Sequence, residues 1–327
     1  MITLVGTLVV AMVAAVLLRL SLGLLSRQLP PPTFVGLVAV AAVAIAGAGG
    51  LALSDLAFAV LGRHQFVATA GGWSPTVWQH VLPVPQPVGW LAMIIVLVLF
   101  VAALVRAVRC VVALVSAELA DRRLGERHGA GEGRVLGRRA GPGYDRVLVV
   151  PDDEPDAYTV AGLRGRVIVT TGMLRCLPDD ERQVLFAHEL SHLRHRHHAY
   201  VQCVEIAAAA NPVLRPVVEA VRHAVERWAD EDAATAVGDR STVARAIARA
   251  GLARHRSATP AVALGVRGGR VADRALALLA PPPPRGRLVA ACLCVFVLAV
   301  GVVSVNSVFS LHGAVEYAQA RLPHLHH

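Results

Sequence analysis

Four long runs of apolar residues dominate the hydropathy pattern of the chain and predict four transmembrane helices. They occupy residues 2–25, 34–60, 88–115 and 288–309. A helix needs about twenty apolar residues to cross the hydrocarbon core of a bilayer, and each run has that length. The first run is too long for a signal peptide and lacks a small-residue cleavage site, so we expect it to remain as a membrane anchor.

Between the third and fourth runs the pattern becomes mixed and predicts a mainly α domain with a small sheet over residues 146–280. The β-branched stretches at 146–150 and 157–171 predict strands. The second stretch is broken near residues 162–165, as the turn of a hairpin would break it.

The helices of this domain have clear start signals. Pro178 and the three acids after it are typical of the first turn of a helix, and we expect a helix over residues 179–198 with helical residues continuing to 210. Asn211-Pro212 predicts a turn. Further amphipathic helices are expected at residues 213–237, 241–254 and 271–280.

Three segments flank or follow these elements. Residues 117–145 continue the third run as a charged helix and then become rich in Gly and Arg, which predicts a flexible basic linker. Residues 281–311 combine a stiff spacer of four prolines with the fourth span. Residues 312–327 are expected to form a short tail.

Composition supports a membrane protein and orients it. Hydrophobic residues make up 55% of the chain and the mean hydropathy is +0.55, both high for a soluble domain. The net charge of +9 comes from Arg, because the chain has no Lys. These Arg residues flank the apolar runs, so we expect no direct nucleic-acid partner.

The Arg residues gather after the first and third runs and before the fourth, whereas only Arg63 lies between the second and third. The positive-inside rule then predicts a multi-pass plasma-membrane protein. Its N-terminus and C-terminus would lie outside, and the domain at residues 146–280 would be cytoplasmic.

The stretch that carries chemistry is His188-Glu189-Leu190-Ser191-His192, which reads H-E-x-x-H. Residues four apart share one face of a helix, so His188 and His192 can direct two imidazoles at one point. The carboxylate of Glu189 lies beside them and can act on a water held there. Zinc peptidases bind metal and activate water in this way, and we predict one Zn²⁺ per chain with Glu189 as the catalytic base.

A third zinc ligand is expected from the helix at 213–237. Glu219, His223, Glu226 and Asp230 form one polar stripe along it. Such a stripe is usually a solvated face, but here Glu226 and Asp230 make an E-x-x-x-D pattern. In that pattern the Glu binds the metal and the Asp accepts the second N–H of a ligand imidazole. His223 is a candidate for stabilising the oxyanion or contacting the substrate.

The histidines after the motif offer an alternative that the sequence excludes. His198 takes the third His position of H-E-x-x-H-x-x-G-x-x-H, but that geometry needs Gly in place of His195 and a Met after the motif. The last Met is Met173. We therefore expect His195, His197 and His198 to form a solvated or weakly metal-binding surface.

Two other kinds of site are also excluded. The five Cys residues contain no C-x-x-C pair, which argues against a disulfide framework and against a Cys zinc site. Arg194 and Arg196 follow the motif closely, which argues against a catalytic centre inside the bilayer. We expect the active site in the cytoplasm or at the membrane surface.

The motif, followed by Arg196-His197 and by Glu226-x-x-Ala229-Asp230, resembles the integral-membrane zinc endopeptidases. The HtpX-like and CAAX prenyl protease-like group shows this pattern, as does the BlaR/MecR group of antirepressor peptidases. Three spans, a protease domain and a fourth span are similar to the BlaR/MecR layout. No penicillin-binding sensor domain is expected after the fourth span, so a signal would enter through the spans or the loop at 63–88.

The resemblance implies a polytopic α-helical membrane protein with four transmembrane helices and a zincin-like protease domain. Its function would be zinc-dependent endopeptidase activity on protein or peptide substrates at the cytoplasmic face. A regulatory role implies a cytoplasmic transcriptional repressor as partner, and a quality-control protease for membrane proteins is the alternative. From another class, a non-enzymatic metal-handling or signalling membrane protein remains open.

Overall fold

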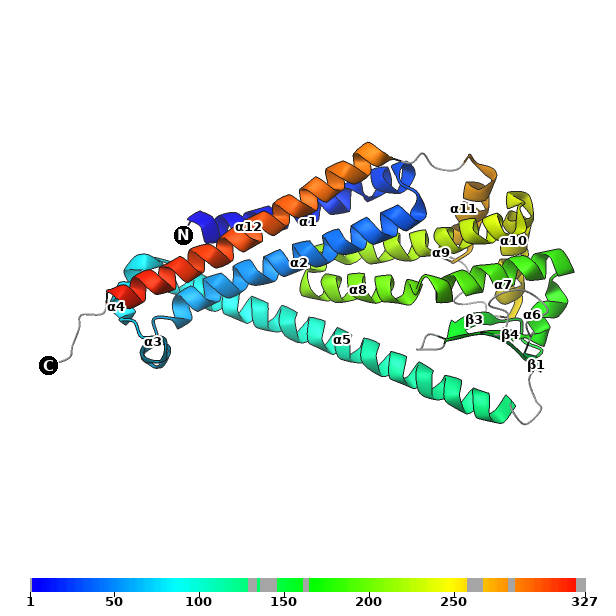
Figure 1. Cartoon of the computed structure of the whole chain (residues 1–327), viewed down its shortest axis with the longest axis horizontal. Coiled ribbons are helices and arrows are strands. Elements are labelled where there is room, and N and C mark those ends of the chain that lie inside the picture. The colour runs from blue at the N-terminus through cyan, green and yellow to red at the C-terminus, as the bar shows by residue number, and fades with distance from the viewer. Residues whose placement is uncertain are drawn as a thin grey trace.

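The computed structural model is organised along a bundle of four long helices (Figure 1). They are α1 (Ile2–Gln28), α2 (Pro31–Leu61), α5 (Gln86–His128) and α12 (Arg287–Ala320). All four are long and apolar enough to cross a membrane, in agreement with the four predicted spans. The described residues are 2–128, 134–135, 146–160, 165–257, 267–281 and 286–321.

The helices extend beyond the predicted spans, α5 and α12 by the most. Helix α5 continues to His128, and α12 continues to Ala320 through much of the segment expected to be a tail. In the expected linker, strand β1 (Arg134–Val135) pairs with the sheet, and residues 129–133 and 136–145 lie outside the described residues. The short helices α3 (Gln65–Gly71) and α4 (Pro75–Val81) lie at the bundle end where α12 finishes (Figure 1).

A four-stranded sheet lies at the opposite end of the bundle (Figure 1). Strands β2 (Val147–Val150), β3 (Ala157–Val160) and β4 (Arg166–Thr170) follow β1, and the spatial order is β1-β2-β4-β3. Strands β3 and β4 form the predicted antiparallel hairpin, while β2 pairs with β4 in parallel. Strand β3 is therefore an edge strand, and the short helix α6 (Thr171–Cys176) follows β4.

The expectation of one helix over residues 179–198 is wrong. Helix α7 (Asp179–Arg194) ends after the motif, and two residues separate it from α8 (His197–Ala210). Between them Arg196 adopts a left-handed conformation with φ of 50°. The break has a packing reason, because residues five apart on a straight helix lie about 140° apart around its axis. The break instead brings the His197 ring against His192.

Helix α8, a 3-10 turn (Pro212–Leu214) and α9 (Arg215–Val237) form a hairpin that enters the helix bundle. Leu214, Val217 and Val221 are fully buried in one apolar cluster with Phe34 and Val38 of α2. Helix α8 also lies against α5 (Figure 1). The sequence predicts a separate domain over residues 146–280 and does not indicate that the α8–α9 hairpin of this domain packs inside the helix bundle.

Two apolar clusters fix the orientation of the motif helix. Leu185 and Phe186 of α7 pack with Val167 of β4, and Val184 packs with α9 and α10 (Arg240–Ser257). Helix α11 (Arg267–Leu279) closes the domain against α10 and α9. Because its apolar positions are held on both sides, α7 directs the imidazoles of its motif towards α9.

Candidate metal centre

His188 and His192 of α7 and Glu226 of α9 bring three metal-binding groups together. Their donor atoms all lie within 4.8 Å of one another. The two histidine Nε2 atoms are 3.2 Å apart. Glu226 Oε2 lies 3.7 Å from His188 Nε2, and Glu226 Oε1 lies 3.7 Å from His192 Nε2. Donor atoms bound at about 2.1 Å to a tetrahedral zinc ion lie about 3.4 Å apart, so the spacing and the donor types fit zinc.

A carboxylate and a guanidinium stand behind these donors. Asp230 Oδ1 lies 3.0 Å from His188 Nδ1, on the ring edge away from the other donors. Arg274 of α11 donates two hydrogen bonds to Asp230, of 2.7 and 2.6 Å. Another of its nitrogens lies 2.8 Å from Glu226 Oε2. No sequence motif marks Arg274, because it lies 44 residues after Asp230 along the chain.

Buried charges set the protonation of the centre. Burial lowers the pKa of His188, but its contacts with Asp230 and Glu226 outweigh burial and raise it to about 9. Burial and then the charge of His188 lower the pKa of His192 to about 4. Burial raises the pKa of Glu226, yet His188 and Arg274 together hold it below its ordinary value. Glu226 is thus an anion and His192 is neutral, as metal ligands are, and His188 must lose a proton to bind a metal.

His197 is a buried neighbour of the centre, so the expectation that it belongs to a solvated surface is wrong. Its side chain is 1% exposed, and its Nδ1 lies 3.0 Å from His192 Nδ1. Its ring packs against that of Trp228 of α9, at 4.7 Å between centroids. Burial and then the nearby His192 and His195 lower the pKa of His197 to about 3. A neutral His197 can accept the Nδ1–H of His192, which leaves Nε2 of His192 free for a metal.

The other two histidines have different surroundings. His195 Nε2 lies 3.0 Å from Asp232 Oδ2, and Ser191 donates a hydrogen bond of 2.6 Å to the same carboxylate. Asp232 thereby ties the end of α7 to α9. His198 is half-buried, and burial and then Arg196 lower its pKa.

Glu189 lies next to the candidate metal centre and is buried. Its side chain is 7% exposed. Thr159 of β3 donates a hydrogen bond of 2.8 Å to Glu189 Oε2 and approaches its backbone oxygen at 3.2 Å. The edge strand therefore touches the motif directly. The sequence predicted a strand near the motif, but no residue pattern identified Thr159.

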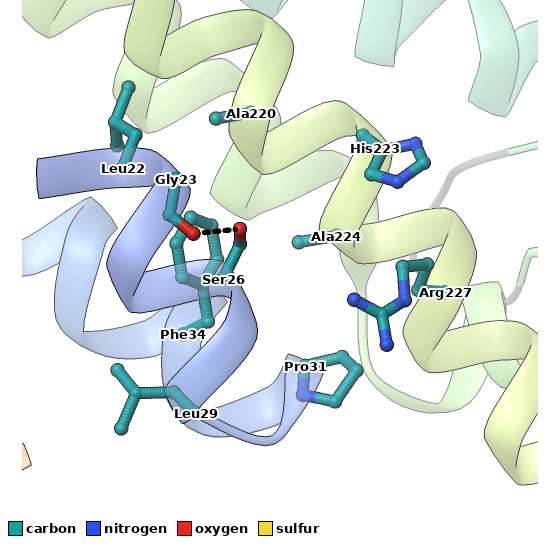
Figure 2. Close-up of a pocket in the computed structure, with 10 residues that line it drawn as sticks. All are labelled: Leu22, Gly23, Ser26, Leu29, Pro31, Phe34, Ala220, His223, Ala224 and Arg227. Atoms are coloured by element: carbon teal, nitrogen blue, oxygen red, sulfur yellow. Dashed lines mark hydrogen bonds between the residues drawn. The ribbon is translucent and has the colours of Figure 1, made fainter. Parts of the chain in front are cut away.

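His223 lies one turn before Glu226 and lines a pocket between α9 and the turn that joins α1 to α2 (Figure 2). It is not among the three residues whose donor atoms converge. Its suggested role at the oxyanion stays a prediction.

The part of the chain that holds this centre is similar to known proteins. Residues 134–259 match Peptidase family M48. A protease HtpX homolog of Paraburkholderia phytofirmans is 40% identical over 65 residues, which are 19% of this chain and 23% of the relative. One of Aeropyrum pernix is 40% identical over 76 residues, which are 22% of this chain and 23% of that relative.

The chain thus spans less than a quarter of the length of these curated relatives. No solved structure matches it significantly. The resemblance to the HtpX-like membrane zinc metallopeptidases is confirmed, while nothing in the comparisons bears on the features specific to the BlaR/MecR group.

Proposed function

We propose that this chain, whose residues 134–259 match peptidase family M48, is a membrane-bound, zinc-dependent metalloendopeptidase that hydrolyses peptide bonds of protein substrates. The observation that carries the proposal is the convergence of His188, His192 and Glu226 at zinc spacing, with a carboxylate beside them. Four helices long and apolar enough to span a bilayer support the membrane attachment.

His188, His192 and Glu226 would hold Zn²⁺, which when bound polarises the scissile carbonyl and lowers the pKa of a water. Glu189 takes the proton of the attacking water and passes it to the leaving amine. The hydrogen bond from Thr159 to Oε2 holds the Glu189 carboxylate in one orientation and leaves Oε1 for the water.

Asp230, Arg274 and His197 act as positioning residues in this mechanism. Asp230 fixes the ring of His188 through Nδ1, and Arg274 holds Asp230 by two parallel hydrogen bonds. His197 does the same for His192 from the neighbouring helix. Loss of a residue that orients a metal-binding imidazole typically lowers metal affinity or activity by about 10–100-fold.

The substrate backbone would lie along β3. This strand is at the edge of the sheet, and its Thr159 contacts the catalytic carboxylate. Its neighbour Tyr158 is exposed. An extended peptide can add to such an edge by main-chain hydrogen bonds, which presents its peptide bonds to the centre whatever its sequence.

The test separates metal binding from catalysis. In purified protein, Glu189→Gln should keep about one zinc per chain and lose proteolysis by on the order of a hundredfold or more, because the carboxylate moves protons and does not bind metal. Glu226→Ala removes a ligand and should lose both zinc and activity. His198→Ala is the matched control and should keep zinc and most activity. Zinc retained by Glu226→Ala and lost by His198→Ala would refute the ligand assignment.

This panel also tests the non-enzymatic alternative. A metal-handling or signalling membrane protein would bind zinc in the wild type and in Glu189→Gln alike, with no proteolysis in either. Cleavage of an unfolded model protein such as casein by the wild type alone would exclude that alternative.

The class of substrate follows from the side of the membrane on which the centre lies. The Arg distribution supports a cytoplasmic centre, and a cytoplasmic repressor or misfolded membrane proteins are then the candidates. Proteomes of cells carrying the wild type or Glu189→Gln would separate them. Accumulation of one DNA-binding repressor in the mutant supports regulation, and accumulation of many membrane proteins supports quality control.

A further inference from the structure

The pocket beside the metal centre lies where the bundle meets the protease domain. Its walls are the last turns of α1, the start of α2 and the middle of α9 (Figure 2). Most of its lining is apolar and comes from candidate membrane spans. Its lining includes Leu22, Gly23 and Ser26 of α1, Leu29 of the α1–α2 turn, Phe34 of α2 and Arg227 of α9.

The polar part of the pocket is cationic. Arg227 extends its guanidinium from α9 towards the turn between α1 and α2 (Figure 2). Among the described residues, none forms a hydrogen bond or ion pair with Arg227, although its helix carries several acids. In the part of the chain that the structure describes, no acidic residue lines the pocket. A partner with one anionic group and an apolar part would satisfy both the guanidinium and the walls.

The surroundings favour a lipid over a peptide. Ser26 already donates its hydroxyl to Gly23 O at 3.0 Å, so few lining groups are left to pair the backbone N–H and C=O groups of a peptide. A phospholipid needs only a cation for its phosphate and apolar surface for its chains. Leu20 and Leu24, on the neighbouring surface of α1, are 74% and 60% exposed, so acyl chains can continue along an apolar surface.

The charge at this end of the bundle also favours an anionic lipid. Arg27 at the end of α1 and Arg287 at the start of α12 are both exposed. The two helix ends touch, since a Cβ on Gly286 would lie 2.1 Å from the backbone oxygen of Gln28. Exposed arginines beside apolar spans attract anionic lipid headgroups.

We propose that the pocket between α9 and the α1–α2 turn is a binding site for an anionic phospholipid, with Arg227 contacting the phosphate and Leu22, Leu29 and Phe34 contacting the apolar part. Because Arg227 directly follows Glu226, an occupied site would restrain the helix that carries the third metal-binding group. This inference concerns lipid binding and stands independently of the proposed peptidase activity.

The test uses the purified full-length protein in detergent, titrated with phosphatidylglycerol or with phosphatidylcholine of the same chains and followed by native mass spectrometry. We expect phosphatidylglycerol to bind about tenfold more tightly, as one charge-assisted contact allows. Arg227→Gln should remove that preference. Arg27→Gln is the matched control, because it removes an equal charge from the nearby end of α1 without changing the pocket lining, and it should keep most of the preference.

A second variant tests the cavity without changing charge. A Cβ at Gly23 meets no atom within 4 Å, so Gly23→Leu should fold and should obstruct the pocket. It should weaken binding of both lipids at this site. Equal losses in Arg27→Gln and Arg227→Gln, or undiminished lipid binding by Gly23→Leu, would show general surface attraction and overturn the proposal.

A peptide pocket would give another pattern. Phosphatidylglycerol binding would be the same in all variants, while Arg227→Gln and Gly23→Leu would raise KM for a protein substrate in lipid-free detergent. That result would also overturn the proposal. Zinc content, measured in parallel, checks that each variant keeps the metal centre intact.

Discussion

Each of the two imidazoles in the candidate metal centre has a neighbouring side chain at its Nδ1 atom. His188 has a carboxylate at its Nδ1, whereas His192 has a second imidazole, that of His197, at the same distance of 3.0 Å. The first pairing adds negative charge behind the ring and, together with Glu226, outweighs the effect of burial and raises the pKa of His188 to about 9. The second pairing is between neutral rings, and it orients His192 and selects its tautomer without adding charge.

His197 therefore provides a prediction at the scale of one residue. His197→Ala should lower zinc affinity or peptidase activity by about 10–100-fold, because His192 Nδ1 loses its acceptor. His197→Gln can still accept a hydrogen bond with its amide oxygen and should recover part of the loss. His198→Ala, one position further on, should change neither. Zinc dissociation constants from competition with a chelator measure the effect, and equal zinc affinity in His197→Ala and the wild type would contradict it.

At the scale of elements, the break between α7 and α8 shapes the site. It bends the chain so that the His197 ring contacts His192, and α8 then continues into the bundle in roughly the same direction as α7 (Figure 1). Glu205 of α8 forms ion pairs with Arg106 of α5 and Arg222 of α9. These pairs tie the hairpin to the third span, which connects the position of Glu226 to the packing of the bundle.

The break depends on Arg196, which has a positive φ. A left-handed conformation costs an L-residue about 1–2 kcal/mol, and glycine avoids that cost. Arg196→Gly should therefore keep or raise stability, while the β-branched Arg196→Val should lower it by about 1–2 kcal/mol. Gln202→Gly, inside α8, is the control of opposite sign and should cost about 1 kcal/mol. Thermal unfolding of the purified variants measures the order, and a lower stability for Arg196→Gly than for Gln202→Gly would contradict the argument.

At the scale of the whole molecule, the two ends of the bundle differ. The side chain of Gln319 near the end of α12 donates a hydrogen bond of 2.7 Å to Gly71 O, so the end of α12 and the α3–α4 segment share one end. The sheet and α7, the helix that carries His188 and His192, lie towards the other end (Figure 1). If the bundle spans a bilayer, these two ends lie on opposite sides of it.

The Arg distribution then predicts which end is cytoplasmic. Reporter fusions after Gly72 and at the C-terminus should report an external location, and a fusion within residues 129–143 should report an internal one. As a control, each site should also carry the reporter of the opposite kind. A reporter that is active only outside the cell and one that is active only in the cytoplasm should give complementary signals at the same site. An external signal from residues 129–143 would reverse the orientation and exclude a cytoplasmic substrate.

The sequence by itself determined the features that depend on neighbours along the chain. Apolar runs predict spans because a bilayer demands a minimum length, and the four-residue spacing of His188 and His192 places both on one helical face. Glu226 and Asp230 could be named because their spacing is also local. The β3–β4 hairpin followed from a broken β-branched stretch.

Only the tertiary structure decided the features that depend on contacts between distant segments. Arg274 reaches Asp230 from another helix, and Thr159 reaches Glu189 from the edge strand. His197 is buried because the break between α7 and α8 places its ring against Trp228 of α9, although a run of basic residues indicates a solvated surface. The same holds for the hairpin of α8 and α9, whose small apolar residues resemble those of a soluble core. Whether such residues face water, protein or lipid depends on what packs against them, and local composition does not contain that information.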